Sequence, residues 1–314
     1  MSTPFISVER LTRRFPHESG SGERTVFEDM CFSVAEGEFV CIIGHSGCGK
    51  STILNILAGL DQPTAGHIIA AGKHVQGPSL DRAVIFQGHA LMPWLSALGN
   101  VELAVSARHP DWPRRRVRQH AMRFLERVHL EGSAMQKPTQ LSGGMRQRVG
   151  IARALAIEPR MLLMDEPFSA LDALTRGALQ DEMVAIRKAS RQTVFMITHD
   201  IEEALLLADK ILLMTNGPNA WIAEVIENTL PATRLRIELH KQPNYYPLRN
   251  HLMDFLVARS REFAAHPELR PKDLHPAVVR PTLTSSVGHV PTSLPSQTPA
   301  QAARQLACGR ISVA

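Results

Sequence analysis

The stretch that decides the fold runs from Gly44 to Thr52 and reads Gly-His-Ser-Gly-Cys-Gly-Lys-Ser-Thr. It directly follows the apolar run Phe39 to Ile43 and opens a segment whose apolar residues recur at helical spacing. Glycines let backbone N–H groups close around phosphate, and the amino end of a helix adds partial positive charge. A purely structural turn would need neither Lys50 nor Ser51. The stretch therefore predicts a loop that binds the phosphates of a nucleotide.

Within this phosphate loop, Lys50 is expected to reach the terminal phosphates and Ser51 to offer its hydroxyl to Mg²⁺. The nucleotide-binding residues predicted here are Gly44, His45, Ser46, Gly47, Cys48, Gly49, Lys50, Ser51 and Thr52.

Composition places the chain among ordinary globular proteins. Its 314 residues are 44% apolar and 21% charged, which suits one large α/β domain with an inserted subdomain, although the length alone would also permit two domains. No apolar run approaches the roughly 18 residues of a membrane-spanning helix, and the first residues lack an apolar signal region, so a cytoplasmic protein is expected. The four cysteines form no CxxC pair, which argues against zinc or a disulfide framework.

The net charge of +5 raises the question of a nucleic-acid partner. The basic residues cluster mainly between Arg114 and Arg118, at the start of an amphipathic stretch that continues to Val128. We interpret this cluster as the solvated face of a helix and expect no nucleic-acid partner.

Short apolar runs elsewhere end at polar residues. The runs are Phe39 to Ile43, Ala83 to Phe86, Met161 to Met164 and Thr193 to Ile197. They are typical of buried parallel strands, whose carboxyl ends face one ligand-binding crevice in an open α/β sheet. The sequence therefore predicts an α/β fold with a mainly parallel sheet, flanking helices and one crevice.

Two acids, Asp165 and Glu166, end one of these strands. Together with a phosphate loop, this pattern is typical of a first acid that holds Mg²⁺ and a second that polarises the attacking water. The alternative is a structural ion pair. Helical periodicity between Gln87 and Leu141 predicts a helical insertion before this strand.

A second glycine-rich helix start lies at Leu141 to Gln147, which reads Leu-Ser-Gly-Gly-Met-Arg-Gln. Its free N–H groups, hydroxyl and positive dipole end would suit a γ-phosphate. Because the chain already has a phosphate loop, we expect Ser142 to Gly144 to complete the site of a second subunit in a head-to-tail pair. The alternative is an ordinary serine-capped helix.

With these motifs in the order described, the chain resembles the ATP-binding subunits of ABC transporters over roughly Phe5 to Glu227. The resemblance implies the P-loop NTPase core of ABC type, with a helical subdomain inserted at about 88–158 and an amino-terminal antiparallel β subdomain. It also implies catalytic roles for Lys50, Glu166 and His199, and Mg²⁺ contacts by Ser51, Gln87 and Asp165.

By the same resemblance, Phe15 stacks under adenine, and the contacts to a partner subunit's nucleotide come from Ser142, Gly143, Gly144, Gln147 and Asp172. Two alternatives stay open at this stage. Phe15 could be an ordinary core residue, and His199 could be a histidine that caps the following helix.

Further stretches are similar to the nitrate, sulfonate and taurine importer group: the phosphate loop with Leu57 to Asp61, and the segment Leu91 to Leu95. The segment Pro243 to Arg249 resembles the nitrate-type members, although it could simply be a closing helix that packs on the core. The hypothesis is uptake of nitrate or a related small oxyanion. The alternatives are sulfonate or taurine import, or a soluble ABC ATPase acting on nucleic acid.

The resemblance implies ATP and Mg²⁺ as cofactors, membrane-spanning permease subunits and a second ATP-binding subunit as partners, and indirect action with a solute-binding protein. It places the chain at the cytoplasmic face of the bacterial inner membrane as a peripheral subunit.

For the domains we predict an ATP-binding domain over 1–235, a helical extension over 236–262 and a disordered tail over 263–314. From Arg280 onward the sequence has no aromatic residue, no acidic residue and no lysine, so little apolar surface is available to offset the entropy of ordering.

Overall fold

The computed structural model describes residues 4–16, 22–189, 192–270 and 274–281. The chain divides into one unit, Met1–Thr282, and a second, Leu283–Ala314, which lies outside the described residues.

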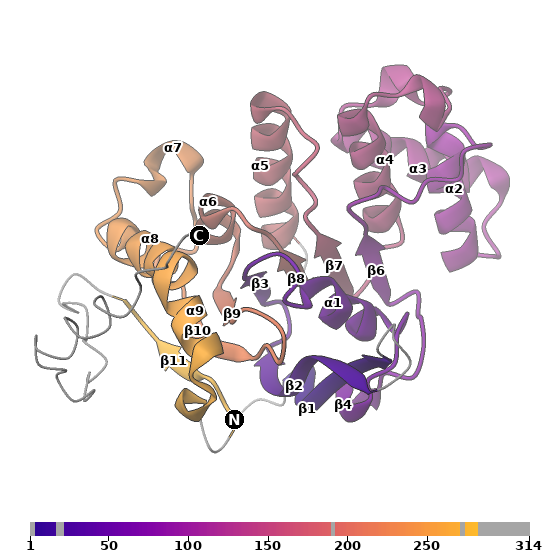
Figure 1. The fold of residues 1–314 in the computed structure, drawn as a ribbon. Coiled ribbons are helices and arrows are strands. Elements are labelled where there is room, and N and C mark those ends of the chain that lie inside the picture. The colour runs from indigo at the N-terminus through magenta and orange to yellow at the C-terminus, as the bar shows by residue number, and fades with distance from the viewer. Residues whose placement is uncertain (1–3, 17–21, 190–191, 271–273, 282–314) are drawn as a thin grey trace, which may run out of the picture. The chain divides into compact units, whose positions relative to one another are not determined.

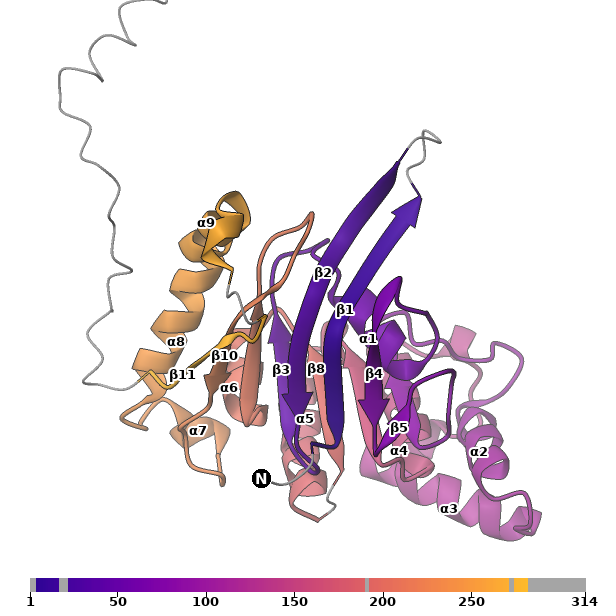
Figure 2. The ribbon, with the colours of Figure 1, turned by 90° about the horizontal axis from the view of Figure 1, so that it is seen from below.

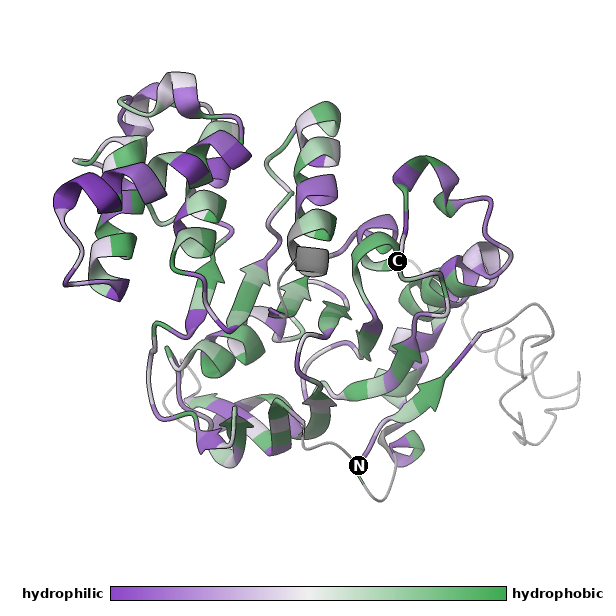
Figure 3. Cartoon of the chain, turned by 180° about the vertical axis from the view of Figure 1, so that it is seen from behind, coloured by the Kyte–Doolittle hydropathy of each residue, from purple (hydrophilic) through white to green (hydrophobic). Residues whose placement is uncertain are grey.

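A seven-stranded sheet in the order β11-β10-β9-β3-β8-β7-β6 forms the centre of the first unit (Figure 1). The five strands from β9 to β6 are parallel, and their interiors are buried, which fits their apolar sequences (Figure 3). The strands are β3 (Phe39–Ile43), β6 (Arg82–Ile85), β7 (Met161–Asp165), β8 (Thr193–Ile197), β9 (Lys210–Met214), β10 (Ile222–Glu227) and β11 (Ala277–Val279).

A separate antiparallel sheet, in the order β2-β1-β4-β5, covers helix α1 (Figure 2). Its strands are β1 (Ile6–Pro16), β2 (Glu23–Val34), β4 (Ala65–Ala70) and β5 (Lys73–His74). Buried residues such as Leu11 and Phe27 pack in one core with α1 and β3. This is the predicted amino-terminal β subdomain.

The predicted helical insertion lies between β6 and β7. Its main helices contact one another, and on α3 the side chains of Arg114, Arg115, Arg116 and Arg118 are exposed, whereas Phe124 and Leu125 are buried. The solvated basic face predicted there is therefore present. The elements are α2 (Ala97–Arg108), α3 (Arg114–Arg127), η1 (Glu131–Ser133), η2 (Pro138–Gln140) and α4 (Gly143–Ala156).

Three further helices complete the α/β core: α1 (Lys50–Ala58), α5 (Ala173–Ala189) and α6 (Ile201–Leu207). Asp200 caps α6, because its side chain accepts hydrogen bonds from the backbone N–H groups of Glu202 and Glu203.

The carboxy-terminal extension is helical and lies beside β10 and β11, at the opposite edge of the sheet from β6 (Figures 1 and 2). It consists of α7 (Arg236–Leu239), α8 (Tyr245–Asp254), the π-helical turn η3 (Phe255–Arg259), α9 (Ser260–Ala265) and η4 (Pro267–Leu269).

The predicted start of a disordered tail at residue 263 is wrong. Helix α9 continues to Ala265, and β11 pairs in parallel with β10, matching Ala277 to Glu224 and Val279 to Ile226. Without β11, the outer edge of β10 would leave its backbone N–H and C=O groups unpaired. The two β-branched valines of β11 favour the strand that pairs with these groups. The predicted tail from 282 to 314 lies outside the described residues.

No helix in the described part of the chain combines the length and the apolar character needed to cross a bilayer.

Candidate nucleotide-binding site

The phosphate loop connects β3 to α1 through glycines that the geometry requires. Gly49, the residue before α1, has φ 105°, and a Cβ added there would lie 2.6 Å from Cγ1 of Val26. A Cβ on Gly44 would lie 2.9 Å from the backbone oxygen of Met214. No side chain caps the amino end of α1, so its first N–H groups are available to a ligand.

Lys50 is 8% exposed, and its ammonium group is held inside the loop. Nζ donates hydrogen bonds to the backbone oxygens of Gly44, at 2.7 Å, and His45, at 2.8 Å. A phosphate oxygen could replace either acceptor, because both bonds join the lysine to the loop that surrounds it.

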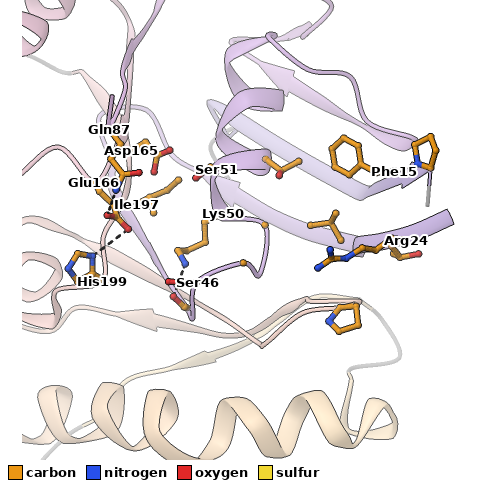
Figure 4. A pocket seen from close by; sticks show the side chains of 18 residues that line it. Phe15, Arg24, Ser46, Lys50, Ser51, Gln87, Asp165, Glu166, Ile197 and His199 are labelled. Carbon is orange, nitrogen blue, oxygen red and sulfur yellow. Dashed lines mark hydrogen bonds and ion pairs between the residues drawn. The ribbon is translucent and has the colours of Figure 1, made fainter. Parts of the chain in front are cut away.

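Asp165 lies at the end of β7 beside the phosphate loop (Figure 4). Burial raises the pKa of its carboxyl group, while a hydrogen bond with the Ser51 hydroxyl opposes that shift. The structure therefore brings a hydroxyl and a carboxylate together, and oxygen ligands of this kind suit Mg²⁺.

Glu166 contacts two residues that the sequence analysis assigns to Mg²⁺ binding or to catalysis. Gln87 Nε2 donates to Glu166 Oε2 at 2.9 Å, and His199 Nδ1 lies 3.4 Å from Oε1 (Figure 4). These residues come from three different strand ends, as expected for the carboxyl edge of a parallel sheet. Glu166 itself has φ 46°, a strained backbone conformation that is often found at functional sites.

One cleft of about 1050 Å³ contains these groups. Phe15 and Arg24 lie at the opposite end of the cleft from Glu166 and His199 (Figure 4). The Phe15 ring is 38% exposed, and the Arg13 guanidinium lies 4.2 Å from its centre, so the reading of Phe15 as a core residue is wrong.

Sequence reasoning missed several residues that line the cleft. They have no motif of their own and reach the site only because β1, β2, β8 and the loop after β9 fold against it. They are Pro16, Arg24, Thr25, Val26, Ile197 and Pro218.

The side chains of His45 and Cys48 do not line this cleft. Cys48 is fully buried, and burial raises the pKa of its thiol. His45 Nε2 donates to the backbone oxygen of Leu256, at 2.7 Å, in the carboxy-terminal extension. Any contact of these residues with phosphate must therefore come from their backbone.

The start of α4 also lies outside the cleft. Ser142 is exposed, and its Oγ accepts the backbone N–H of Met145 at 3.2 Å, so it caps the helix. Asp172 caps α5 through the backbone N–H groups of Leu174 and Thr175, and the bond from Thr175 contributes most to lowering its pKa.

Gln147 differs from this group. Its side chain is 2% exposed and accepts a hydrogen bond from His89. The predicted contact of Gln147 with a partner's nucleotide cannot form in this conformation, because α4 turns the residue inward while Ser142 faces outward.

Comparison with known proteins shows to which family a chain with this cleft belongs. The bicarbonate transport ATP-binding protein CmpD from a Synechocystis species is 48% identical over 258 residues, covering 82% of this chain and 91% of that protein. Residues 27–169 also match the ABC transporter family. The chain belongs to the ABC transporter family. It is an ATP-binding subunit that binds ATP and hydrolyses it to ADP and phosphate, as the motifs predicted.

A second relative of this ABC ATPase is the nitrate import ATP-binding protein NrtD from Synechococcus elongatus, 47% identical, covering 82% of this chain and 94% of NrtD. Among solved structures, the dimeric post-hydrolysis state of the ATP-binding cassette MJ0796 bound to ADP and Pi superimposes with a TM-score of 0.66. It is 31% identical and covers 72% of this chain and 100% of that one. The predicted family and fold are confirmed.

Proposed function

We propose that this ABC ATPase powers the import of a small planar oxyanion, nitrate or bicarbonate. The observation that carries the proposal is near-equal identity, 48% and 47%, to relatives named for bicarbonate transport and for nitrate import. Both ions are trigonal oxyanions, so a transport system for one is chemically close to a system for the other. Taurine and sulfonates carry a tetrahedral oxyanion and remain the alternative cargo.

The working unit is a head-to-tail pair of ATP-binding subunits. The support is that Ser142, Gly143 and Gly144 form an outward helix start that does not line the chain's own cleft. In a pair, these neutral donors would complete the site on the second subunit. Asp172 would contribute to the same surface, because the side chain of Leu171, the residue before it, lies against Gly144.

The cleft residues singled out by the sequence then have the following roles in ATP binding and hydrolysis. Lys50 exchanges its loop carbonyls for phosphate oxygens, and Glu166 accepts a proton from the attacking water. His199 orients the γ-phosphate end, and Phe15 supports the adenine at the far end of the cleft. Ser51, Asp165 and Gln87 would hold Mg²⁺, which supplies charge neutralisation for the phosphates when bound.

The partners are membrane-spanning permease subunits, which the chain meets as a peripheral subunit on the cytoplasmic face of the bacterial inner membrane. A solute-binding protein on the other side would deliver the cargo. The exposed side chain of Trp94, in the segment after Gln87, offers an aromatic anchor for a permease helix.

The test is the ATPase rate of the reconstituted transporter with its solute-binding protein. Nitrate, nitrite, cyanate, bicarbonate, taurine and alkanesulfonates are compared at equal concentration. We expect stimulation by nitrate or bicarbonate. Stimulation by taurine or a sulfonate alone would refute the cargo assignment and leave the ATPase intact.

A further inference from the structure

One part of the carboxy-terminal extension contacts two segments of the nucleotide cleft. We call this part the clamp and define it as Tyr245–Arg259, which comprises α8 and η3. Its contacts reach the phosphate loop and the helix that follows His199, two segments far apart in the sequence.

The first contact holds the phosphate loop. His45 Nε2 donates to the Leu256 oxygen at 2.7 Å, while the backbone oxygen of the same histidine accepts from Lys50 Nζ at 2.8 Å. The clamp thus fixes the residue whose carbonyl helps to hold Lys50. Leu256 belongs to η3, a π-helical turn, and such turns are rare and frequently found at functional sites.

The second contact holds the start of α6. Glu202 accepts hydrogen bonds from the Tyr245 hydroxyl and from Arg249 Nε, the latter at 2.8 Å. Burial, together with the Glu202 carboxylate, raises the pKa of Tyr245, so its hydroxyl stays protonated and donates. Glu202 lies in the first turn of α6, whose cap Asp200 directly follows His199.

The clamp is itself firmly attached to the sheet. Leu248, Leu252 and Phe255 are fully buried in the core. Glu224 of β10, 6% exposed, pairs with His251 of the clamp at 2.6 Å and also with Arg259. Because the clamp is anchored here, its contacts with His45 and Glu202 can resist movement of the two segments.

We propose that the clamp positions the ATP site for hydrolysis, with His45 and Glu202 as its positioning residues. The His45 contact keeps the phosphate loop in its binding geometry and therefore acts on ATP affinity. The Glu202 contact fixes the start of α6 and therefore acts on the placement of His199 during turnover. This inference rests on the proposed roles of Lys50 and His199 in the cleft.

The Glu202 contact is tested by Tyr245→Phe in the full-length chain, because this change removes only a hydroxyl. We expect kcat to fall about three- to tenfold with KM for ATP nearly unchanged, as for loss of one hydrogen bond of ordinary strength, because Arg249 still binds Glu202. The matched control is Tyr246→Phe. The Tyr246 side chain is 55% exposed on the same helix, and we expect wild-type kinetics from this variant.

The His45 contact is tested by His45→Ala and by His45→Gln, whose amide can still donate to the Leu256 oxygen. We expect His45→Ala to raise KM and the dissociation constant for ATP about fivefold with little change in kcat, and His45→Gln to restore most of the affinity. Thermal midpoints are recorded for all variants, so that a general loss of stability is recognised.

The clamp would be supported if Tyr245→Phe lowers only kcat and His45→Ala raises only KM for ATP. The inference is overturned if Tyr245→Phe behaves as Tyr246→Phe does, or if His45→Gln is as impaired as His45→Ala. It is equally overturned if kcat and KM change together in proportion to the thermal midpoint. An inactive wild-type chain would instead refute the ATP site itself, so the two failures are distinguishable.

Discussion

Two helices of this ATPase begin with a glycine-rich segment, yet their starts are built differently. Before α1, Gly49 adopts φ 105° and no side chain caps the helix end. The first residue of the helix, Lys50, is buried. Before α4, Ser142 has an ordinary extended backbone and uses its own hydroxyl to cap Met145. One start has positive charge and free N–H groups inside a cleft, and the other is an exposed helix end with neutral donors.

The difference indicates a division of labour. A buried lysine beside free backbone N–H groups can bind phosphate without a contribution from a second subunit. A capped helix end with neutral donors gives weak affinity by itself and is better suited to contact phosphate that another subunit already holds. We therefore expect damage at α1 to abolish binding or chemistry, and damage at α4 to spare binding and impair only the assembled pair.

The largest effect is expected from Glu166→Gln, which changes the residue after β7 in the same cleft as the start of α1. This change removes the proposed base and preserves shape, so turnover should fall about 10² to 10⁴-fold while ATP binding persists. Lys50→Ala provides the contrast, because it should weaken ATP binding itself. Steady-state ATPase rates and ATP titrations measure both, and normal turnover in Glu166→Gln would refute the assignment.

A change on the α4 side, Ser142→Arg, should have the next largest effect. The added side chain would block the approach of a partner's phosphate, so turnover should fall about 10- to 100-fold with ATP affinity per monomer unchanged. Ser142→Ala is the matched control, which removes the cap at a cost of about 1 kcal/mol and leaves the surface open. If Ser142→Arg lost ATP affinity, the division between the two helix starts would be wrong.

Glu224→Gln changes neither helix start directly, and its main expected effect is on the free energy of unfolding. Although burial opposes ionisation, the hydrogen bond from His251 and the charge of Arg259 hold the pKa of Glu224 below its ordinary value. The stabilisation is therefore present above the unfolded-state pKa and is lost as pH falls through the folded-state pKa.

At pH 7 we expect Glu224→Gln to cost about 2 kcal/mol in free energy of unfolding, and this difference should shrink below about pH 4.3. Urea unfolding of both proteins from pH 7 to pH 3 measures it. A difference that is constant with pH would show that the charge of Glu224 contributes nothing.

The smallest effect is expected from deleting residues 282–314, whose composition offers little apolar surface for packing. The thermal midpoint and the ATPase rate should stay nearly unchanged. Deleting residues 274–314 is the comparison, because it also removes β11 and the bond between Arg280 and Glu227, and we expect a loss of a few degrees. Equal loss in both deletions would assign a structural role to 282–314.

The nucleotide site was predictable where local sequence dictates local geometry. Gly49 and Lys50 form a loop with a fixed conformation, and Asp165 and Glu166 end a strand that is recognisable from its apolar run. Within such a short motif, the local backbone conformation sets the direction in which each side chain points. The strand ends then meet because the sheet is parallel.

Long-range packing was not predictable from the same patterns. Arg24 and Thr25 reach the cleft only through the pairing of β2 with β1, and Gln147 turns inward because of its place on α4. The strand Ala277–Val279 was missed because it forms only where the edge of β10 is available to pair with it. Such contacts depend on partners distant in the sequence, which one stretch of residues cannot reveal.

The central claim, that two subunits share each ATP, is tested most directly by the mass of Glu166→Gln in solution with saturating ATP. Light scattering during gel filtration should give a dimer with ATP and a monomer without it, and a monomer again when Ser142→Arg is added to Glu166→Gln. A monomer in ATP-bound Glu166→Gln, or a dimer that survives Ser142→Arg, would contradict the account.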